Sequence, residues 1–241
     1  MDGGTGIDQH QNNTWYSFQK GELELLLAAL GISSWYGIGD TYAAQKIKQA
    51  DVNRLLADMF GRGIVSFDDG RLIISEEQKE IAGVIGNAGV CIVSLSASDG
   101  GMTSVSYCCE DKAAVLRADV AGRVIVKLLD IKDWPSFILR EGLKESGRTQ
   151  DAASGNGLEK SLPESTLGES LKSAVNDTGA SLGLDLVNSR TGEVRKRMLV
   201  FEHGLKRHAV IEQNDIAMSM LGGKLTELRR ILRDWTAERD A

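Results

Sequence analysis

The side chains in this sequence that could bind a metal or attack a substrate are few, with three cysteines and three histidines among 241 residues. Cys108 and Cys109 are neighbours in a predicted strand, so their side chains should point to opposite faces and could not share one metal ion. The CxxC and HExxH spacings of zinc sites do not occur in the sequence. We therefore expect no metal and no cofactor, and we interpret the cysteines as buried apolar side chains in a reducing compartment.

Paired carboxylates occur at Asp68-Asp69 and at Glu76-Glu77, in a predicted hairpin turn and at a predicted helix start. Turn formation and stabilisation of the helix dipole account for acidic residues at such places. The sequence contains no GxSxG nucleophile elbow, no GxxxxGK[ST] phosphate loop and no GxGxxG that follows a strand and opens a helix. We expect no catalytic residues, and the enzymatic alternative is an enzyme of an unrecognised type.

Two basic tripeptides, Arg195-Lys196-Arg197 and Lys206-Arg207-His208, lie on predicted strands that a short turn joins. Their charges could share one patch and anchor an acidic partner. The alternative is that they are solvated strand faces, which also protect a sheet edge from unwanted pairing.

The turn at 98–102 is a second candidate for contact with a partner, because Met102 is an apolar residue beside two glycines. A glycine-rich loop that carries a methionine can adapt to a partner's surface. Alternatively, Met102 is simply the first residue of the next strand. The candidate partner-binding residues are Asp99, Gly100, Gly101, Met102, Arg195 and Arg197.

The chain carries 34 acidic and 28 basic side chains, a net charge of −6. This balance argues against general affinity for DNA or RNA, which needs a basic surface. No apolar run approaches the ~18 residues of a membrane-spanning helix. Met1 to Asn13 also lack an apolar stretch of signal-peptide type. We therefore expect a cytoplasmic protein with no membrane partner.

Residues 20–74 have the element order of a winged helix, and residues 1–19 are expected to be a disordered start. Leucines at i, i+3, i+4 and i+7 predict a helix from about Lys20 to Gly31. Further helices are expected at 41–49 and from Asp51 onward, and a hairpin with an Asp-Gly turn at 64–74.

A winged helix that reads DNA presents basic and amide side chains from the helix before its hairpin. Here that helix, Asp51–Arg62, offers Arg54 and Arg62 against Asp51 and Asp58. The module could therefore bind DNA, dock a protein or be purely structural, and nucleic acid is the less favoured partner.

Beyond this module, the order helix, four-stranded meander, helix occurs twice, at 75–145 and at 164–241. A polar, glycine-rich segment at 146–163 separates the two units and is expected to be a flexible linker. We interpret the repeat as an internal duplication with a pseudo-two-fold relation, and the alternative is two unrelated segments of similar size. The predicted strands are 90–97, 103–108, 113–118 and 123–129 in the first unit and 181–187, 194–201, 206–212 and 216–221 in the second.

The predicted fold class is thus α+β: a winged-helix-like helical module followed by two duplicated helix–four-strand meander–helix units. A leucine-rich helical module (GELELLLAALGI), a short hairpin (GIVSFDDGRLIIS) and repeated hairpins (VCIVSLSASDGGMTSVSYCC, AAVLRADVAGRVIVKLLDI) carry this order. In its order of elements the chain resembles the EspG family of type VII (ESX) secretion chaperones. The resemblance implies a pseudo-two-fold central sheet with helices, and it implies a cytosolic chaperone that is not an enzyme.

From this resemblance, the expected partner is a helical protein client, namely a helical-bundle substrate of a type VII-like secretion system. A chaperone of this kind covers an apolar helical tip on its client while staying soluble itself. The alternative function is a winged-helix transcriptional regulator with a C-terminal sensing domain. A regulator should bind its own promoter with a steep salt dependence, whereas a chaperone should bind a small helical protein.

Overall fold

The computed structural model describes residues 15–19, 21–32, 49–97, 102–118, 123–143, 166–203, 206–213, 216–221 and 224–238. Within these ranges it contains helices and one large antiparallel sheet, which confirms the predicted α+β class. The predicted linker at 146–163 and the start of the chain up to residue 14 lie outside the described residues. So does nearly all of the helix predicted at 41–49.

The large sheet runs in the order β1-β7-β6-β5-β4-β8-β9-β10-β11, and every neighbouring pair is antiparallel. A separate hairpin pairs β2 with β3. The strands are β1 (Tyr16–Phe18), β2 (Val65–Asp68), β3 (Arg71–Ile74), β4 (Val90–Ser96), β5 (Met102–Cys108), β6 (Lys112–Ala118), β7 (Val124–Asp130), β8 (Leu182–Asn188), β9 (Val194–His203), β10 (Lys206–Gln213) and β11 (Ile216–Leu221).

Six helices lie in the described part of the chain, and each occurs where the predicted order of elements has a helix. A capping box forms at the start of α3, where the Gln78 backbone N–H donates to Ser75 Oγ (3.3 Å) and the Ser75 N–H donates to Gln78 Oε1 (3.3 Å). The helices are α1 (Glu22–Ala29), α2 (Gln49–Gly61), α3 (Glu76–Asn87), α4 (Trp134–Gly142), α5 (Thr166–Thr178) and α6 (Leu225–Thr236).

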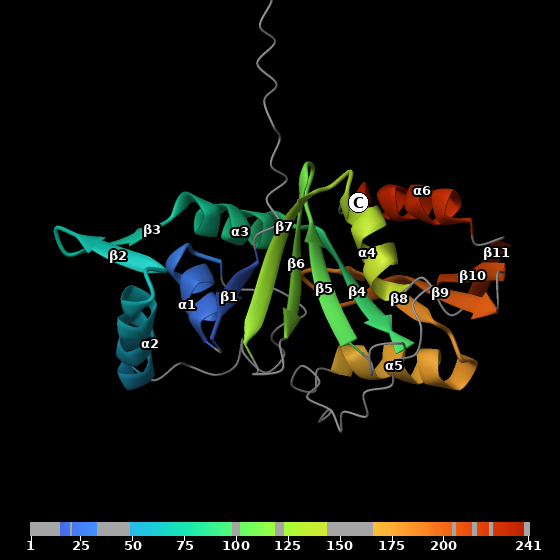
Figure 1. Cartoon of the computed structure of the whole chain (residues 1–241), viewed down its shortest axis with the longest axis horizontal. Helices are drawn as coiled ribbons and strands as arrows, with labels where there is room; N and C mark the ends of the chain where they lie inside the picture. Colours follow the sequence, from blue (N-terminus) through green and yellow to red (C-terminus); the bar gives the residue numbers. More distant parts are fainter. Residues whose placement is uncertain are drawn as a thin grey trace, which may run out of the picture.

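Helices cover both faces of the sheet, because strand residues alternate between two apolar cores. Val93 packs in the core that also contains side chains of α1, α3 and α5. Its neighbour Ile92 packs in the opposite core, with Trp134 of α4 and Leu228 of α6. Figure 1 shows α4 and α6 close together, and the two helices are in contact. The result is a three-layer arrangement with the sheet in the middle.

The cysteines follow the same alternation. Cys91 is buried in one core and Cys108 in the other, as predicted for apolar cysteines, and burial raises the pKa of the Cys91 thiol to about 12. Cys109 follows the end of β5 and is half-buried, and its thiol donates to the Val84 carbonyl oxygen (3.2 Å).

The two meanders meet at the β4–β8 pair in the centre of the sheet. Val90 pairs with Asn188 and Ser96 pairs with Leu182, so exchanging the two strands leaves the register unchanged. β5, β6 and β7 follow on one side of this pair, and β9, β10 and β11 follow on the other. An offset of 92 residues (182 minus 90) relates the start of β4 to the start of β8.

One prediction was wrong near the N-terminus. Tyr16–Phe18, within the expected disordered start, forms β1 and pairs with β7, with Tyr16 opposite Val126 and Phe18 opposite Val124. Phe18 is buried in the core beneath α1, and this burial offsets the entropic cost of ordering a strand of three residues. A three-residue strand is too short for its alternation to be recognised in the sequence.

Candidate functional site

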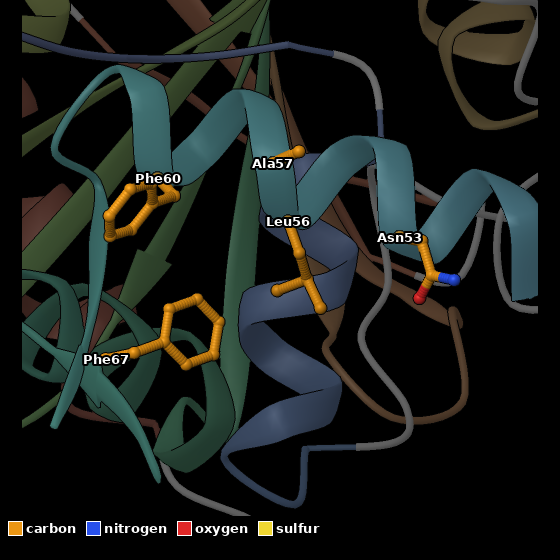
Figure 2. Close-up of a pocket in the computed structure, with 5 residues that line it drawn as sticks. All are labelled: Asn53, Leu56, Ala57, Phe60 and Phe67. Carbon is orange, nitrogen blue, oxygen red and sulfur yellow. The ribbon is translucent and has the colours of Figure 1, made fainter. Parts of the chain in front are cut away.

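An open apolar groove of about 290 Å³ lies between α2 and β2. Its aromatic walls are Phe60, 56% exposed, and Phe67, 49% exposed, which are among the most exposed large apolar side chains in the described residues. Figure 2 shows the two rings next to each other, with Leu56 beside them. The ring centroids are 5.9 Å apart and the rings are tilted by 45°. The groove is lined by Asn53, Leu56, Ala57, Phe60 and Phe67.

The helical spacing explains why α2 presents this face. Leu55 and Met59 are buried toward the body of the protein, whereas Phe60 is displaced around the helix and faces outward. Leu56 and Phe60 are four residues apart, so they lie on the same side of the helix. All of the lining residues are uncharged, and the groove therefore suits an apolar occupant.

The hairpin turn holds Phe67 in place. Asp69 (φ 47°) and Gly70 (φ 74°) both have positive φ, as expected for a tight two-residue turn, and this turn confirms the predicted Asp-Gly hairpin. Strand alternation puts Phe67 on the same face as Val65, which is buried. Its cross-strand partner is Leu72. Phe67 therefore lies on the same face of the hairpin as the buried Val65, but nearer to the turn, where the core no longer covers its ring.

A buried ion pair fixes the end of α2. Glu22 is fully buried, and Arg62 Nη1 donates to both of its carboxylate oxygens, at 2.9 and 2.7 Å. Arg62 Nη2 also donates to the Ser17 carbonyl oxygen (2.7 Å), and the Gln19 N–H donates to Glu22 (2.6 Å). Arg62 thus ties α2 to β1 and α1.

This contact bears on the DNA-binding alternative. Arg62, one of the two cations considered for reading DNA, is engaged inside the protein. The other, Arg54, is exposed and lies 3.7 Å from Asp51. The exposed residues of α2 also include Asn53, Ala57, Asp58 and Phe60.

The candidate residues chosen from the sequence lie elsewhere. Asp99, Gly100 and Gly101 are outside the described residues, and Met102 is the first residue of β5, opposite Ser96. Ser96 pairs in turn with Leu182, and Leu182 with Val200. Arg195 is half-buried near the start of β9, toward the other end of the strands. The fold therefore does not bring Met102 and Arg195 together.

Arg197 forms an internal ion pair. Its Nε and Nη2 donate to the two carboxylate oxygens of the buried Asp185, at 2.7 and 2.8 Å, and Nη2 also donates to Ser170 Oγ of α5 (3.1 Å). Burial raises the pKa of Asp185, and the Arg197 guanidinium opposes that rise. Arg197 thus has a role in tying α5 to the sheet.

The β9–β10 register separates the two tripeptides, so the first of the two alternatives, one shared basic patch, does not form. Arg197 lies opposite Glu212, near the end of β10, whereas Arg207 lies opposite Glu202, near the end of β9. Besides Arg197, two more of these basic side chains have acidic partners: Arg207 Nε donates to Glu202 (2.9 Å), and Lys196 pairs with Glu238. The tripeptides at 195–197 and 206–208 therefore occupy opposite ends of one hairpin.

A second, smaller polar site lies under α4. Arg117 Nη1 donates to Glu141 (2.9 Å), and its guanidinium lies 5.4 Å from the ring centroid of Phe137. The hydroxyls of Ser94 and Ser104 are 2.5 Å apart. The enclosed space is only about 10 Å³, roughly enough for one water molecule, so this cluster is a buried polar contact rather than a ligand pocket.

Neighbouring charges also act on Lys127, which is nearly buried on β7. Burial, reinforced by the Arg140 and Arg117 cations and opposed by Glu141, lowers its pKa. Its ammonium lies 5.5 Å from the ring centroid of Trp15.

Across the described residues there is no group of three or more His, Cys, Asp or Glu side chains that could hold a metal ion. The helices described here include none with the length and apolar character needed to cross a membrane. No protein-family model matches the chain, and comparison with curated proteins finds no significant match.

Sequence reasoning missed the groove. It assigned no role to Leu56, Phe60 or Phe67. A signal was present, because Phe60 lies off the stripe formed by Leu55 and Met59, and Phe67 lies beside the hairpin turn. Large aromatic residues at such exposed positions are typical of interaction surfaces.

Proposed function

We propose that this protein is a cytosolic chaperone that binds a helical-bundle substrate of a type VII-like secretion system and keeps it soluble, without catalysis. The observation that carries the proposal is the exposed aromatic pair, Phe60 and Phe67, in a groove that contains no charged side chain. The client contributes an amphipathic helix, and the apolar face of that helix occupies the groove. The order of elements, which resembles the EspG family, supports the choice of client.

The groove has the properties that helix recognition needs. A helix-in-groove complex uses apolar anchors spaced three or four residues apart on the bound helix. Two aromatic side chains that are already half-exposed can supply most of the binding free energy, because aromatic residues lose little side-chain entropy on binding. Asn53 adds a polar group at one end of the groove, where it can orient the client.

Two architectural proposals accompany this function. First, the two meander units are related by a pseudo-two-fold axis through the β4–β8 pair. The reciprocal register of that pair supports this relation, as does the matching order α3-β4 to β7-α4 and α5-β8 to β11-α6. Second, α1, α2 and the β2–β3 hairpin form a winged-helix-like module that serves as a docking module for protein.

The second candidate function is a winged-helix regulator, and the order α1-α2-β2-β3 is the observation that favours it. The internal ion pair of Arg62 and the uncharged lining of the groove on α2 make this candidate weaker. A DNA-reading helix would offer several cations or amides to the major groove.

A solubility experiment tests the proposal. Small helical proteins encoded beside this one would be produced alone and together with this protein, and the soluble fraction of each would be measured after centrifugation. We expect one of them to be soluble only in the joint preparation and to form a complex with this protein. If all are equally soluble alone, or if this protein instead binds its own upstream DNA specifically at moderate salt, the chaperone proposal is wrong.

A further inference from the structure

The lining of the groove is uncharged, but the surface that surrounds it is not. Residues 49–74, which include α2 and the β2–β3 hairpin, contain four aspartates, three arginines and no glutamate or lysine. Two of the arginines are paired with acidic groups: Arg62 with the buried Glu22, at 2.7 Å, and Arg54 with Asp51, at 3.7 Å. Their positive charges are therefore offset within the protein.

The other three aspartates lie beside the aromatic walls of the groove, and all three are exposed. Asp68 and Asp69 directly follow Phe67 in the chain. Asp58 precedes Phe60 by two residues on α2. Successive Cα atoms are about 3.8 Å apart and Cα atoms two residues apart on a helix about 5.4 Å, both less than the Debye length of about 8 Å at physiological salt. None of these aspartates lines the groove, so an occupant would meet their charges at its flanks.

One arginine remains to oppose these aspartates. Arg71 is exposed and lies opposite Asp68 across the hairpin. Three aspartates and one arginine leave an excess of two negative charges beside the groove. This local charge has the same sign as that of the whole chain, which is −6. It attracts cations to the groove and repels anions from it.

We infer that the client helix is cationic, with lysine or arginine on both flanks of the apolar stripe that occupies the groove. Asp68 and Asp69 border the groove on the hairpin side, and Asp58 is on the α2 side. Complementary charge selects such a helix over an anionic helix with the same stripe. The inference rests on the proposed function, because it states the chemistry of the helix that this function places in the same groove.

The dimensions of the groove set the length of the stripe. Its lining on α2 extends from Asn53 to Phe60, which at 1.5 Å per residue is about 10.5 Å, or two helical turns. A client helix that packs along this length offers apolar side chains at i, i+3 or i+4, and i+7. The residues that flank this stripe are then within one turn of an anchor, where the charges of Asp58 and Asp68 act on them.

Two designed peptides test the inference without the natural client. Both are about 18 residues long, so that a helix can form, and both have the same leucine stripe. One has lysine on both flanks of the stripe, and the other has glutamate at the same positions. By fluorescence anisotropy at about 0.1 M salt, we expect the lysine peptide to bind about tenfold more tightly than the glutamate peptide. The preference should fall below about threefold at about 1 M salt, where the Debye length is about 3 Å.

Two matched double variants locate the source of this preference. Asp58→Asn/Asp68→Asn removes the excess charge beside the groove and should bring the two peptides within about twofold of each other. Asp177→Asn/Glu193→Gln makes the same change in net charge at exposed positions on α5 and just before β9, and should keep the preference at about tenfold. Figure 1 shows α5 and β9 away from α2 and the β2–β3 hairpin, toward the other end of the long axis.

Failure of the inference and failure of the proposed function give different results. If the glutamate peptide binds at least as tightly as the lysine peptide, and Phe60→Ala/Phe67→Ala abolishes that binding, the groove binds a helix but the inference is wrong. A preference that persists in Asp58→Asn/Asp68→Asn, or that both charge variants lose equally, would also overturn it. If neither peptide binds, or if Phe60→Ala/Phe67→Ala binds the lysine peptide as the wild type does, the groove does not bind a helix and the proposed function fails as well.

Discussion

Val93 and Asp185 lie directly opposite each other across the β4–β8 pair, at the centre of the sheet. Each also pairs outward within its own meander, Val93 with Val105 of β5 and Asp185 with Arg197 of β9. The offset of 92 residues (182 minus 90) relates Val93 to Asp185 and Val105 to Arg197. The valine pair in one half of the sheet and the ion pair in the other therefore occupy corresponding positions. One half of the sheet therefore has an apolar contact where the other half has a buried charge pair.

This relationship predicts how the ion pair responds to substitution. Arg197→Val alone leaves the Asp185 carboxylate buried without its partner, and it should lower the free energy of unfolding by about 3–5 kcal/mol. The double variant Asp185→Val/Arg197→Val copies the valine pair and should recover most of that loss. Urea unfolding of the wild type, both single variants and the double variant gives the coupling energy. Losses that simply add would show that Asp185 and Arg197 do not stabilise each other.

The ion pair also predicts a pH dependence. Burial raises the pKa of Asp185 in the folded protein, although Arg197 opposes the shift. The folded state therefore binds this proton more tightly than the unfolded state, in which an aspartate has a pKa of about 3.9. The contribution of Asp185 to stability should fall as pH rises from that value through the folded-state pKa.

Comparison with Asp185→Asn isolates this effect. The free energy of unfolding of the wild type, minus that of the variant, should decrease as pH increases over this window. A difference that is constant with pH would show that Arg197 cancels the effect of burial on the pKa of Asp185, and an increase with pH would show that Arg197 outweighs it.

The ion pair of Arg62 gives a prediction about the module that carries the groove. Arg62→Met removes the partner of the fully buried Glu22 and should cost about 3 kcal/mol or more of stability. Arg54→Met, on the same helix, removes an exposed cation and should cost less than about 1 kcal/mol. Thermal unfolding of the two variants makes the comparison. Equal effects would mean that Arg62 does not anchor α2.

Much of the sheet could be predicted from local sequence, whereas the site could not. Alternation and turn residues identified β4 to β11 because each strand is six residues or longer and is bounded by glycine, asparagine or aspartate. The separation of Arg197 from Arg207 follows from the short turn between the two strands, which puts 206–208 beside the end of β9 and 195–197 at its start, so it could have been predicted from the sequence. The groove depends on α2 meeting β2 in space, and its signal was limited to the off-stripe position of Phe60.

The central claim is that the groove binds a client helix, and a calorimetric titration of the client into groove variants tests it most directly. Phe60→Ala/Phe67→Ala removes both aromatic walls. The control, Ile73→Ala, removes another exposed apolar side chain, on the other face of the hairpin. Both variants should keep the wild-type circular dichroism spectrum, because all three side chains are substantially exposed.

We expect the double variant to bind the client at least about thirtyfold more weakly than the wild type, a loss of roughly 2 kcal/mol that is typical of removing anchor residues. Ile73→Ala should bind within about threefold of the wild type. Wild-type affinity in a folded Phe60→Ala/Phe67→Ala variant would contradict the claim that this groove is the binding site.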